Sequence, residues 1–290
     1  MRTLALLLFP AFAMAQQVSD TAYHYPLAKV MYTADTGPLI LFDQAHNNPH
    51  TLKGRYAAFG DLLRQDGYQV EPAREKLTPA LLRPAKIFVS ANALYDRANW
   101  DLPTGSAYTE NEVKILHDWV QNGGSLFLLT DHMPCGASVN TVALSFGFNV
   151  VNGYAARTDR QEEIFTKKKG NLHQHAVTRG IDSLMVWGGT GFLAPAGAQV
   201  IASLGAGYEI FLPSKAEQIT DTTPRLSGLG FVNAASLEYG RGRIVVFGDG
   251  APFTAQLEGI YSRKRGMNHP KAGQNAPLLL NIIHWLDRKL

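Results

Sequence analysis

Cysteine is almost absent from this chain, since Cys135 is the only one among 290 residues. A lone thiol cannot form an intramolecular disulfide, and neither the paired Cys-x-x-Cys pattern nor the His-Glu-x-x-His pattern of many zinc sites occurs. Disulfide scaffolds and recognisable zinc motifs are therefore excluded. A hydrophobic core has to hold the fold, and the chain length and the apolar content of 46% suffice for one.

An excess of charge of one sign is also missing. The 27 Lys and Arg residues and the 24 Asp and Glu residues leave a formal net charge of +3, which is too small to indicate a polyanion partner. Basic clusters at Lys167 to Lys169 and at Arg263 to Arg265 lack the interleaved aromatic residues of a nucleic-acid surface. We interpret both clusters as solvated loops and expect no nucleic-acid partner.

Long apolar runs are confined to the first residues. The stretch from Leu4 to Ala15 follows Arg2 and ends in Ala13-Met14-Ala15, a small-x-small pattern typical of a signal peptidase site. This stretch is too short to cross about 30 Å of hydrocarbon. We expect residues 1–15 to be a signal peptide, and residues 16–290 to form one secreted or periplasmic domain without a transmembrane segment. The oligomeric state stays open.

Short apolar runs alternate with amphipathic stretches along most of the remaining chain. This alternation is typical of an α/β fold, in which crossover helices join the strands of a mostly parallel sheet. The predicted strands are 38–43, 68–72, 85–92 and 125–131, and the predicted helices are 52–65, 79–82, 109–124 and 139–148. The helix that begins after Thr109 is the most clearly marked, because Thr109 and Glu112 form a capping-box pattern.

The second half of the chain is less regular. Residues 149–224 are rich in glycine and polar residues, with short extended runs at 200–204 and 208–212, and their topology is not predictable. A Gly-Arg-Gly turn between two strand-like runs, 235–239 and 243–248, predicts a late β-hairpin. An amphipathic helix ends the chain.

Asp and His residues gather where the predicted strands end. In an open parallel sheet, ligands bind beyond the carboxyl ends of the strands, so these residues are expected to meet at one rim. The candidate catalytic residues are Asp43, His46, Asp131, His132 and Asp249. The candidate ligand-binding residues are Asn47, Asn92, Asn268 and His269.

These residue types support two chemistries. An Asp can orient a His that transfers protons near neutral pH, or both can bind a divalent metal that activates water. The alternative is structural, because short polar residues at strand ends often cap the amides of the following turn. The loop before the last helix has two interpretations as well: it folds over the rim, or it is a surface turn in which Asn275 caps the helix.

Two nucleophile types are disfavoured. Cys135 lies outside the tight strand-to-helix elbow that catalytic nucleophiles occupy, and no Gly-x-Ser-x-Gly motif is present for a Ser-His-Asp hydrolase. His117 and His284 fall inside helical patterns, where packing or surface roles are the usual ones.

The segment DWVQNGGSLFLLTDH resembles the helix-Gly-Gly-strand segment of the class I glutamine amidotransferase-like superfamily, including its trehalose-utilisation-like branch. The segments ILFDQAHNN, QHAVTRGI, FGDGAPF and NAPLLLNIIHWL are similar to members of it too. The resemblance implies a three-layer, flavodoxin-like fold. It does not imply glutamine hydrolysis, because Asp131-His132 stands where the enzymes have their nucleophilic Cys, and Gly248-Asp249-Gly250 stands where they have His-x-Glu.

Three functions remain open. The chain binds a small polar molecule or saccharide at the rim, it is a hydrolase that uses the Asp and His residues with or without a divalent metal, or it is a structural envelope protein. Aromatic side chains near the rim would favour a saccharide, with Tyr95, Trp100 and Trp187 as the candidates. The structural alternative predicts no deep pocket.

Overall fold

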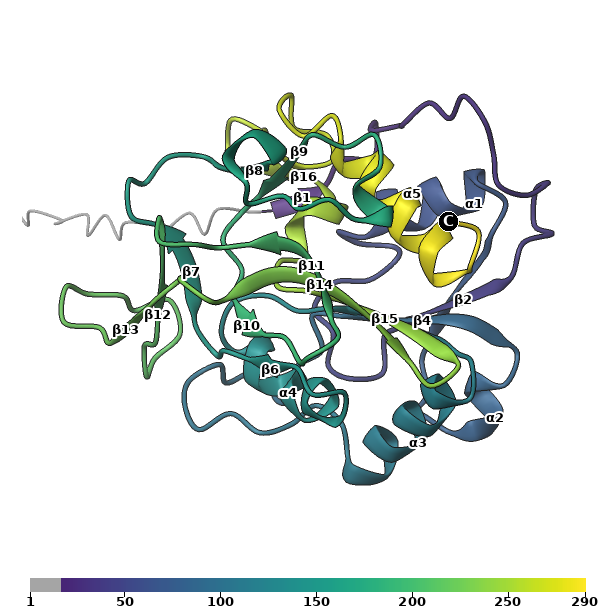
Figure 1. Cartoon of the computed structure of the whole chain (residues 1–290), viewed down its shortest axis with the longest axis horizontal. Coiled ribbons are helices and arrows are strands. Elements are labelled where there is room, and N and C mark those ends of the chain that lie inside the picture. Colours follow the sequence, from purple (N-terminus) through teal and green to yellow (C-terminus); the bar gives the residue numbers. More distant parts are fainter. Residues whose placement is uncertain (1–16) are drawn as a thin grey trace, which may run out of the picture.

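A nine-stranded mixed sheet runs through the centre of the computed structural model, which describes residues 17–290 (Figure 1). The predicted signal peptide lies outside the described residues. The strand order is β3-β2-β4-β5-β15-β14-β10-β6, and β11 pairs with β14. Their bounds are β2 Leu39–Asp43, β3 Gln69–Ala73, β4 Ala85–Ala91, β5 Ser125–Leu129, β6 Asn149–Val150, β10 Phe192–Leu193, β11 Gln199–Ser203, β14 Val232–Tyr239 and β15 Gly242–Phe247.

Parallel pairing is confined to the first part of this sheet. Strands β3, β2, β4, β5 and β15 run parallel to their neighbours, whereas β14 pairs antiparallel with β15, and β10, β6 and β11 also pair antiparallel. The predicted mixed, mostly parallel α/β sheet with its late hairpin is confirmed.

Helices cover both faces of the sheet, which gives three layers (Figure 1). One face carries α1 and α5, and the other carries α2, α3 and α4. The bounds are α1 Ala57–Gln65, α2 Pro79–Leu82, α3 Glu110–Gln121, α4 Cys135–Ser145 and α5 Asn275–Leu286.

The unbroken apolar runs of the parallel strands are explained by these two layers. Successive side chains of a strand point to opposite faces. In β2, Ile40 and Phe42 therefore join the core under α1 and α5, while Leu41 joins the core under α2, α3 and α4. A strand covered on both faces needs apolar residues at every position.

Local signals determine where several helices begin and end. The predicted capping box is present before α3, because the Thr109 hydroxyl accepts a hydrogen bond from the Glu112 amide and the Glu112 carboxylate accepts one from the Thr109 amide. Helix α1 begins later than predicted, since Thr51 and the residues after it form turns. Helix α4 begins at Cys135 rather than residue 139, and it ends before Gly147, whose φ of +86° is incompatible with a helix.

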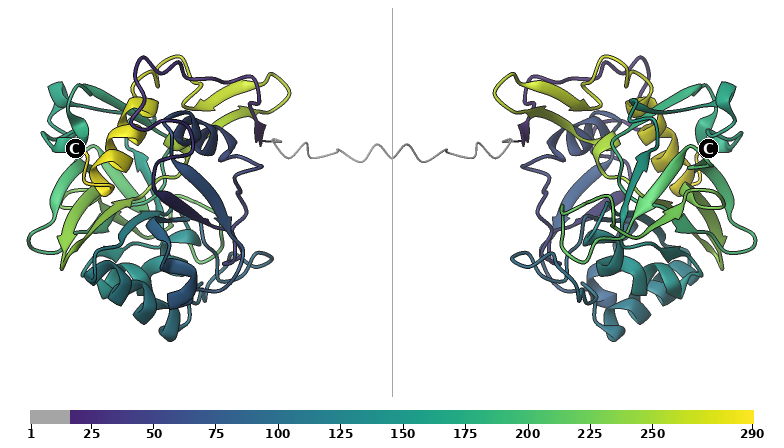
Figure 2. Two further views of the ribbon diagram at one scale, coloured as in Figure 1. Left: turned by 90° about the vertical axis from the view of Figure 1, so that its right-hand side faces the viewer. Right: turned by 90° about the vertical axis from the view of Figure 1, so that its left-hand side faces the viewer.

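The remaining strands form smaller sheets, and several of them fall in residues 149–224, whose topology was not predictable. They are β7 Tyr154–Arg157 with β12 Tyr208–Phe211 and β13 Arg225–Ser227, β8 Glu163–Thr166 with β9 Ser183–Val186, and β1 Gln17–Ser19 with β16 Ala255–Glu258 and β17 Arg263–Gly266. The arm of β16 and β17 lies beside β1 at the margin of the molecule (Figure 2). In residues 17–290, no helix has the length and apolarity that a membrane crossing requires.

Candidate functional site

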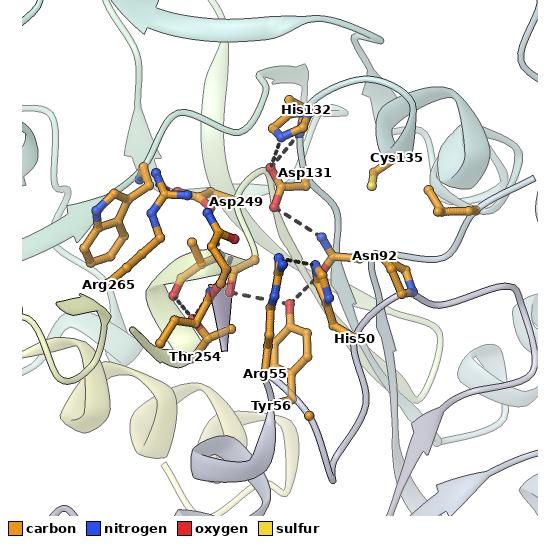
Figure 3. Close-up of a pocket in the computed structure, with 18 of the residues that line it drawn as sticks. His50, Arg55, Tyr56, Asn92, Asp131, His132, Cys135, Asp249, Thr254 and Arg265 are labelled. Carbon is orange, nitrogen blue, oxygen red and sulfur yellow. Dashed lines mark hydrogen bonds and ion pairs between the residues drawn. The ribbon is translucent and has the colours of Figure 1, made fainter. Parts of the chain in front are cut away.

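A cavity of about 860 Å³ opens at the carboxyl ends of β4, β5 and β15, and we call it the strand-end cavity. Asn92 follows β4, Asp131 and His132 follow β5, and Asp249 follows β15 (Figure 3). The other side chains used below come from the loop before α1, from the chain after β4 and β9, from β7, and from β16 and β17. They are His50, Arg55, Tyr56, Arg97, Trp100, Tyr154, Trp187, Gln256 and Arg265.

His132 and Asp131 face this cavity as a loosely joined pair. The Nδ1 atom of His132 lies 2.8 Å from the Met133 carbonyl oxygen, which only accepts, so Nδ1 carries a proton. The Nε2 atom lies 3.8 Å from Asp131 Oδ1, too far for a hydrogen bond. The imidazole stacks on the Tyr154 ring with a centroid distance of 4.6 Å. Nε2 is therefore oriented and free to exchange a proton with a bound molecule.

Asn92 links the ends of two strands through a backbone conformation that is unusual for a side-chain-bearing residue, with φ at +48°. Its Nδ2 donates to Asp131 Oδ2 at 3.2 Å, and its Oδ1 accepts from the Tyr56 hydroxyl at 2.6 Å. A Cβ at Gly250 would lie 2.4 Å from the Tyr56 hydroxyl, so only glycine fits there. Strained residues that several contacts hold in place are common at functional sites.

Asp249 is fully buried on the inner side of the same cavity. Its carboxylate accepts hydrogen bonds from the backbone amides of Ala251 at 2.9 Å and Trp187 at 2.5 Å. Burial and the nearby Asp131 charge nevertheless raise the pKa of Asp249 to about 7. A carboxyl group that can hold or release a proton near neutral pH is thus present at the strand ends.

Cationic groups line the cavity as well. Arg55 Nη1 lies 3.1 Å from His50 Nε2 (Figure 3). Burial and the Arg55 charge lower the pKa of His50 to about 4, so this imidazole is neutral at pH 7 and accepts from the guanidinium. Arg97 and Arg265 also line the cavity. The site therefore combines acidic, basic and aromatic groups.

All three predicted aspartates also cap the turn that follows their strand. Asp43 accepts from the Ala45 amide at 3.1 Å, Asp131 from the His132 amide at 2.8 Å, and Asp249 from the Ala251 amide. The capping interpretation therefore describes part of each residue's role. Asp131 also lines the strand-end cavity while it caps its turn.

Asp43 and His46 do not line the strand-end cavity, contrary to the expected single rim. His46 Nδ1 lies 2.8 Å from Asp43 Oδ1, and its Nε2 lies 3.0 Å from Glu112 Oε1. The Tyr108 hydroxyl donates to Asp43 Oδ2 at 2.7 Å, and its ring stacks on the imidazole. Helix α3 and Tyr108 thus close this strand end, and all four side chains are buried.

Three of the four predicted ligand-binding residues also lie elsewhere. Asn47 is on the surface, where its side chain donates to the carbonyls of Leu94 and Tyr95. Asn268 is buried and donates to Asp20 Oδ2 at 2.8 Å. His269 lines a neighbouring groove. Only Asn92 of this set lines the strand-end cavity.

The loop before α5 follows neither interpretation made from the sequence. Gln274 is the N-cap residue of α5, and Asn275 is its first helical residue. The Asn275 side chain instead bonds the backbone amide and carbonyl of Met185 at 3.1 and 2.8 Å. Asn275 therefore attaches the helix to β9 and does not cap it.

The donor set for a metal is not assembled in the described residues. In residues 17–290 no group of three or more His, Cys, Asp or Glu side chains is arranged to hold a metal ion. Cys135 lines the cavity at the start of α4, but burial and Asp131 raise its pKa well above the usual range. A buried protonated thiol is a poor nucleophile.

Comparisons with solved structures identify the fold. The chain is similar to the mmIFT52 N-terminal domain with 14% identity and a TM-score of 0.60, covering 85% of this chain and 96% of that one. It is also similar to a Thermoplasma acidophilum protein described as a GMP synthase component, with 11% identity, coverage of 87% and 95%, and a TM-score of 0.47.

A ThuA-like protein from Bacteroides uniformis matches as well, with 12% identity, coverage of 91% and 95%, and a TM-score of 0.46. No protein-family model and no curated protein matches the sequence. The match to the mmIFT52 N-terminal domain shows the fold of this chain, which is the class I glutamine amidotransferase-like fold. Identities this low establish the fold alone.

Several residues of the strand-end cavity were not among the sequence candidates. Tyr56 belongs to a helical apolar pattern, and Arg265 belongs to a cluster interpreted as a solvated loop. Arg55 carries no motif. What these residues share is that they follow the end of a central strand in the chain: Arg55 and Tyr56 come after β2, and Arg265 comes after β15. Contacts between distant parts of the chain bring them to the cavity, so a local sequence pattern could not identify them.

Proposed function

We propose that this chain binds a small saccharide in the strand-end cavity and has no glutaminase activity. The observation that carries the proposal is the pairing of aromatic and polar side chains in one cavity. Trp100 and Trp187, two of the three aromatic residues expected near a sugar site, line it together with Asn92, Asp131 and Arg55. Tyr95, the third, is not among its lining residues and is exposed.

This mixture matches the chemistry of a sugar ring. The C–H face of a sugar packs on an aromatic ring, while its hydroxyl groups donate to carboxylates and accept from amides and guanidinium groups. The buried Gln256 lines the cavity, and its Oε1 atom has no hydrogen-bond partner in the described residues. A ligand hydroxyl would satisfy that acceptor, since a buried unpaired polar atom costs about 1–3 kcal/mol.

Export is part of the proposal. The signal-peptide pattern of residues 1–15 supports a secreted or periplasmic location, where a saccharide is a common ligand. The missing nucleophile at the end of β5 supports the absence of glutamine hydrolysis, because Asp131 and His132 stand there. Fractionation of cells and N-terminal sequencing of the mature protein test the location.

A glycan array probed with the mature protein tests the binding proposal. We expect selective binding of a small set of saccharides, and Trp187→Ala is expected to weaken it by about tenfold or more, a change of about 1.4 kcal/mol. Tyr261→Ala is the matched control, because Tyr261 is an exposed aromatic residue outside the cavity. If no saccharide binds, or if both variants lose binding equally, the proposal is wrong.

A hydrolase is the second candidate, and the orientation of His132 favours it. Its protonated Nδ1 is held by a carbonyl, its Nε2 is free, and Asp131 is close enough to stabilise an imidazolium. Asp249, with its raised pKa, would supply a proton near neutral pH. The purified protein is assayed for hydrolysis of each saccharide that binds on the array, and of ester and phosphate substrates. If a substrate is hydrolysed and the His132→Gln variant loses this activity, the hydrolase replaces the binding protein as the proposed function.

The structural-envelope alternative has less support. It predicts no deep pocket, whereas the described residues enclose a cavity of about 860 Å³ with convergent polar groups. If the purified protein binds a saccharide selectively, a purely structural role is no longer needed to explain the protein.

A further inference from the structure

A second hollow adjoins the strand-end cavity, and we call it the basic groove. Its volume is about 710 Å³. Four cationic side chains line it: Arg160 before β8, and Arg263, Lys264 and Arg265 of β17. The groove lies between two small sheets that the central fold does not require, β8 with β9 and the arm of β16 and β17.

The positive charge of this groove is largely uncompensated. Glu258 lies 3.6 Å from Arg265, and Glu162 is paired with Lys271 at 2.5 Å. Within residues 17–290, the side chains of Arg160, Arg263 and Lys264 have no ion-pair partner.

The remaining acidic residue of the groove, Glu163, adds little negative charge. Burial, together with the nearby Asp249, raises the pKa of Glu163 to about 8. It is therefore mostly protonated at pH 7, and its Oε2 atom has no hydrogen-bond partner in the described part of the chain. A neutral carboxyl group does not cancel the neighbouring cations, and it offers a donor to an anionic oxygen.

The groove and the strand-end cavity share two side chains. Trp187 and Arg265 line both, so each contacts a molecule in either hollow. The Trp187 ring is packed edge-on against His269 with a centroid distance of 5.8 Å. A ligand that stacks on Trp187 therefore reaches the cations of the groove with its next substituent or sugar unit.

We infer that the ligand is an acidic saccharide that extends from the strand-end cavity into the basic groove, an inference that rests on the proposed saccharide binding. One sugar ring lies in the cavity, and an anionic substituent or a second, acidic unit lies among Arg160, Arg263, Lys264 and Arg265. Guanidinium groups suit this task, since their planar donors bind carboxylate, sulfate and phosphate oxygens in pairs.

Binding of paired oligosaccharides to the mature protein tests this inference. The probes are oligogalacturonate with its methyl ester, and sulfated galactan oligomers with their desulfated counterparts, titrated by calorimetry. We expect one acidic member to bind at least about tenfold more tightly than its neutral counterpart, with an advantage that shrinks as salt rises. The carboxylate and sulfate pairs distinguish the source of the anionic oxygens.

The double variant Arg263→Gln, Lys264→Gln is expected to bind the acidic ligand about tenfold more weakly and to bind the neutral ligand with unchanged affinity. Lys168→Gln, Lys169→Gln is the control, because it removes the same charge from η1 (Lys167–Lys169), outside both hollows. Equal binding of acidic and neutral members, or an unchanged preference in the groove variant, overturns this inference alone. If no member of any pair binds, this inference fails, whereas the saccharide proposal is decided by the glycan array.

Discussion

Two strand ends of this protein carry the same pair of residue types and use them differently. After β2, Asp43 and His46 are sealed, with side-chain exposures of 1% and 0%. After β5, Asp131 and His132 face the strand-end cavity, with exposures of 17% and 34%. The pairs differ in what covers them, since Glu112 and Tyr108 close the first and nothing equivalent closes the second in the described residues.

The closed cluster is hydrogen-bonded on every side. Both ring nitrogens of His46 lie within hydrogen-bond distance of a carboxyl oxygen, one from Asp43 and one from Glu112. Asp43 and Glu112 are also satisfied by other donors, the Tyr108 hydroxyl and the Leu77 amide among them. A fully satisfied polar network rigidifies a fold and leaves no group for a ligand. The open pair retains that capacity.

Removing the imidazole from each pair is expected to give the largest contrast. His46→Ala leaves the buried carboxyl groups of Asp43 and Glu112 without the ring nitrogens that they bond, and we expect the free energy of unfolding to fall by about 3–5 kcal/mol. His132→Ala removes a partly exposed ring and is expected to cost about 1 kcal/mol or less. Urea denaturation of both variants measures this, and equal losses would erase the distinction between the clusters.

Asn92 tests how strongly the open pair depends on the fold around it. Asn92→Ala places a residue with φ at +48° in an unfavourable conformation and removes the partner of the Tyr56 hydroxyl, so we expect a loss of about 2–3 kcal/mol. Asn92→Gly is the control, because glycine tolerates this conformation and loses only the side-chain contacts. If the glycine variant is no more stable than the alanine variant, the backbone conformation at residue 92 does not contribute to the loss.

The tyrosines that stack on the two imidazoles give a smaller contrast. Tyr108→Phe removes a buried hydroxyl that bonds Asp43 and lies 2.7 Å from the Ser90 hydroxyl, and we expect a loss of about 1–2 kcal/mol. Tyr154→Phe removes a hydroxyl that donates to the Met133 carbonyl at 3.2 Å at the cavity, and a loss below about 1 kcal/mol is expected. Thermal denaturation distinguishes the two, and the reverse order would contradict the assignment of closed and open clusters.

The two regions are also expected to respond to pH in opposite directions. Burial opposes ionisation of Glu112, but hydrogen bonds from the Thr109 amide, His46 and Leu77 outweigh it and lower its pKa from 4.5 to about 2. The unfolded state therefore binds more protons in this window, and this stabilisation is lost as pH falls from about 4.5 to 2. Glu112→Gln is expected to flatten the stability profile there.

The pKa of Glu163, beside the cavity, is shifted in the opposite direction. Its pKa is raised from 4.5 to about 8, so the folded state holds the extra proton and the stabilisation is lost as pH rises through that range. Glu163→Gln is expected to raise the melting temperature at pH 8.5 relative to the original protein, with little difference at pH 4. A variant that follows the original profile at both ends would show that the carboxyl group titrates normally.

Much of the fold follows from local pattern. Unbroken apolar runs mark β2, β4 and β5, because a strand covered by helices on both faces has no polar side. The capping box locates α3, and the Gly-Arg-Gly turn locates the hairpin of β14 and β15. The extended runs predicted at 200–204 and 208–212 correspond to β11 and β12. The topology of residues 149–224 escaped prediction because their strands are short and pair only in small sheets or at the margin of the central one.

The candidate site divides in the same way. Strand ends and residue types were enough to select Asn92, Asp131, His132 and Asp249, since the carboxyl ends of neighbouring parallel strands meet at one edge. Whether an Asp and a His stay open to a ligand depends on what packs over them, as Glu112 of α3 does over His46. The sequence by itself determined the sheet and the chemistry at its edge. Only the tertiary structure decided which strand end is closed and which cations of β17 reach the cavity, because those contacts join residues far apart in the chain.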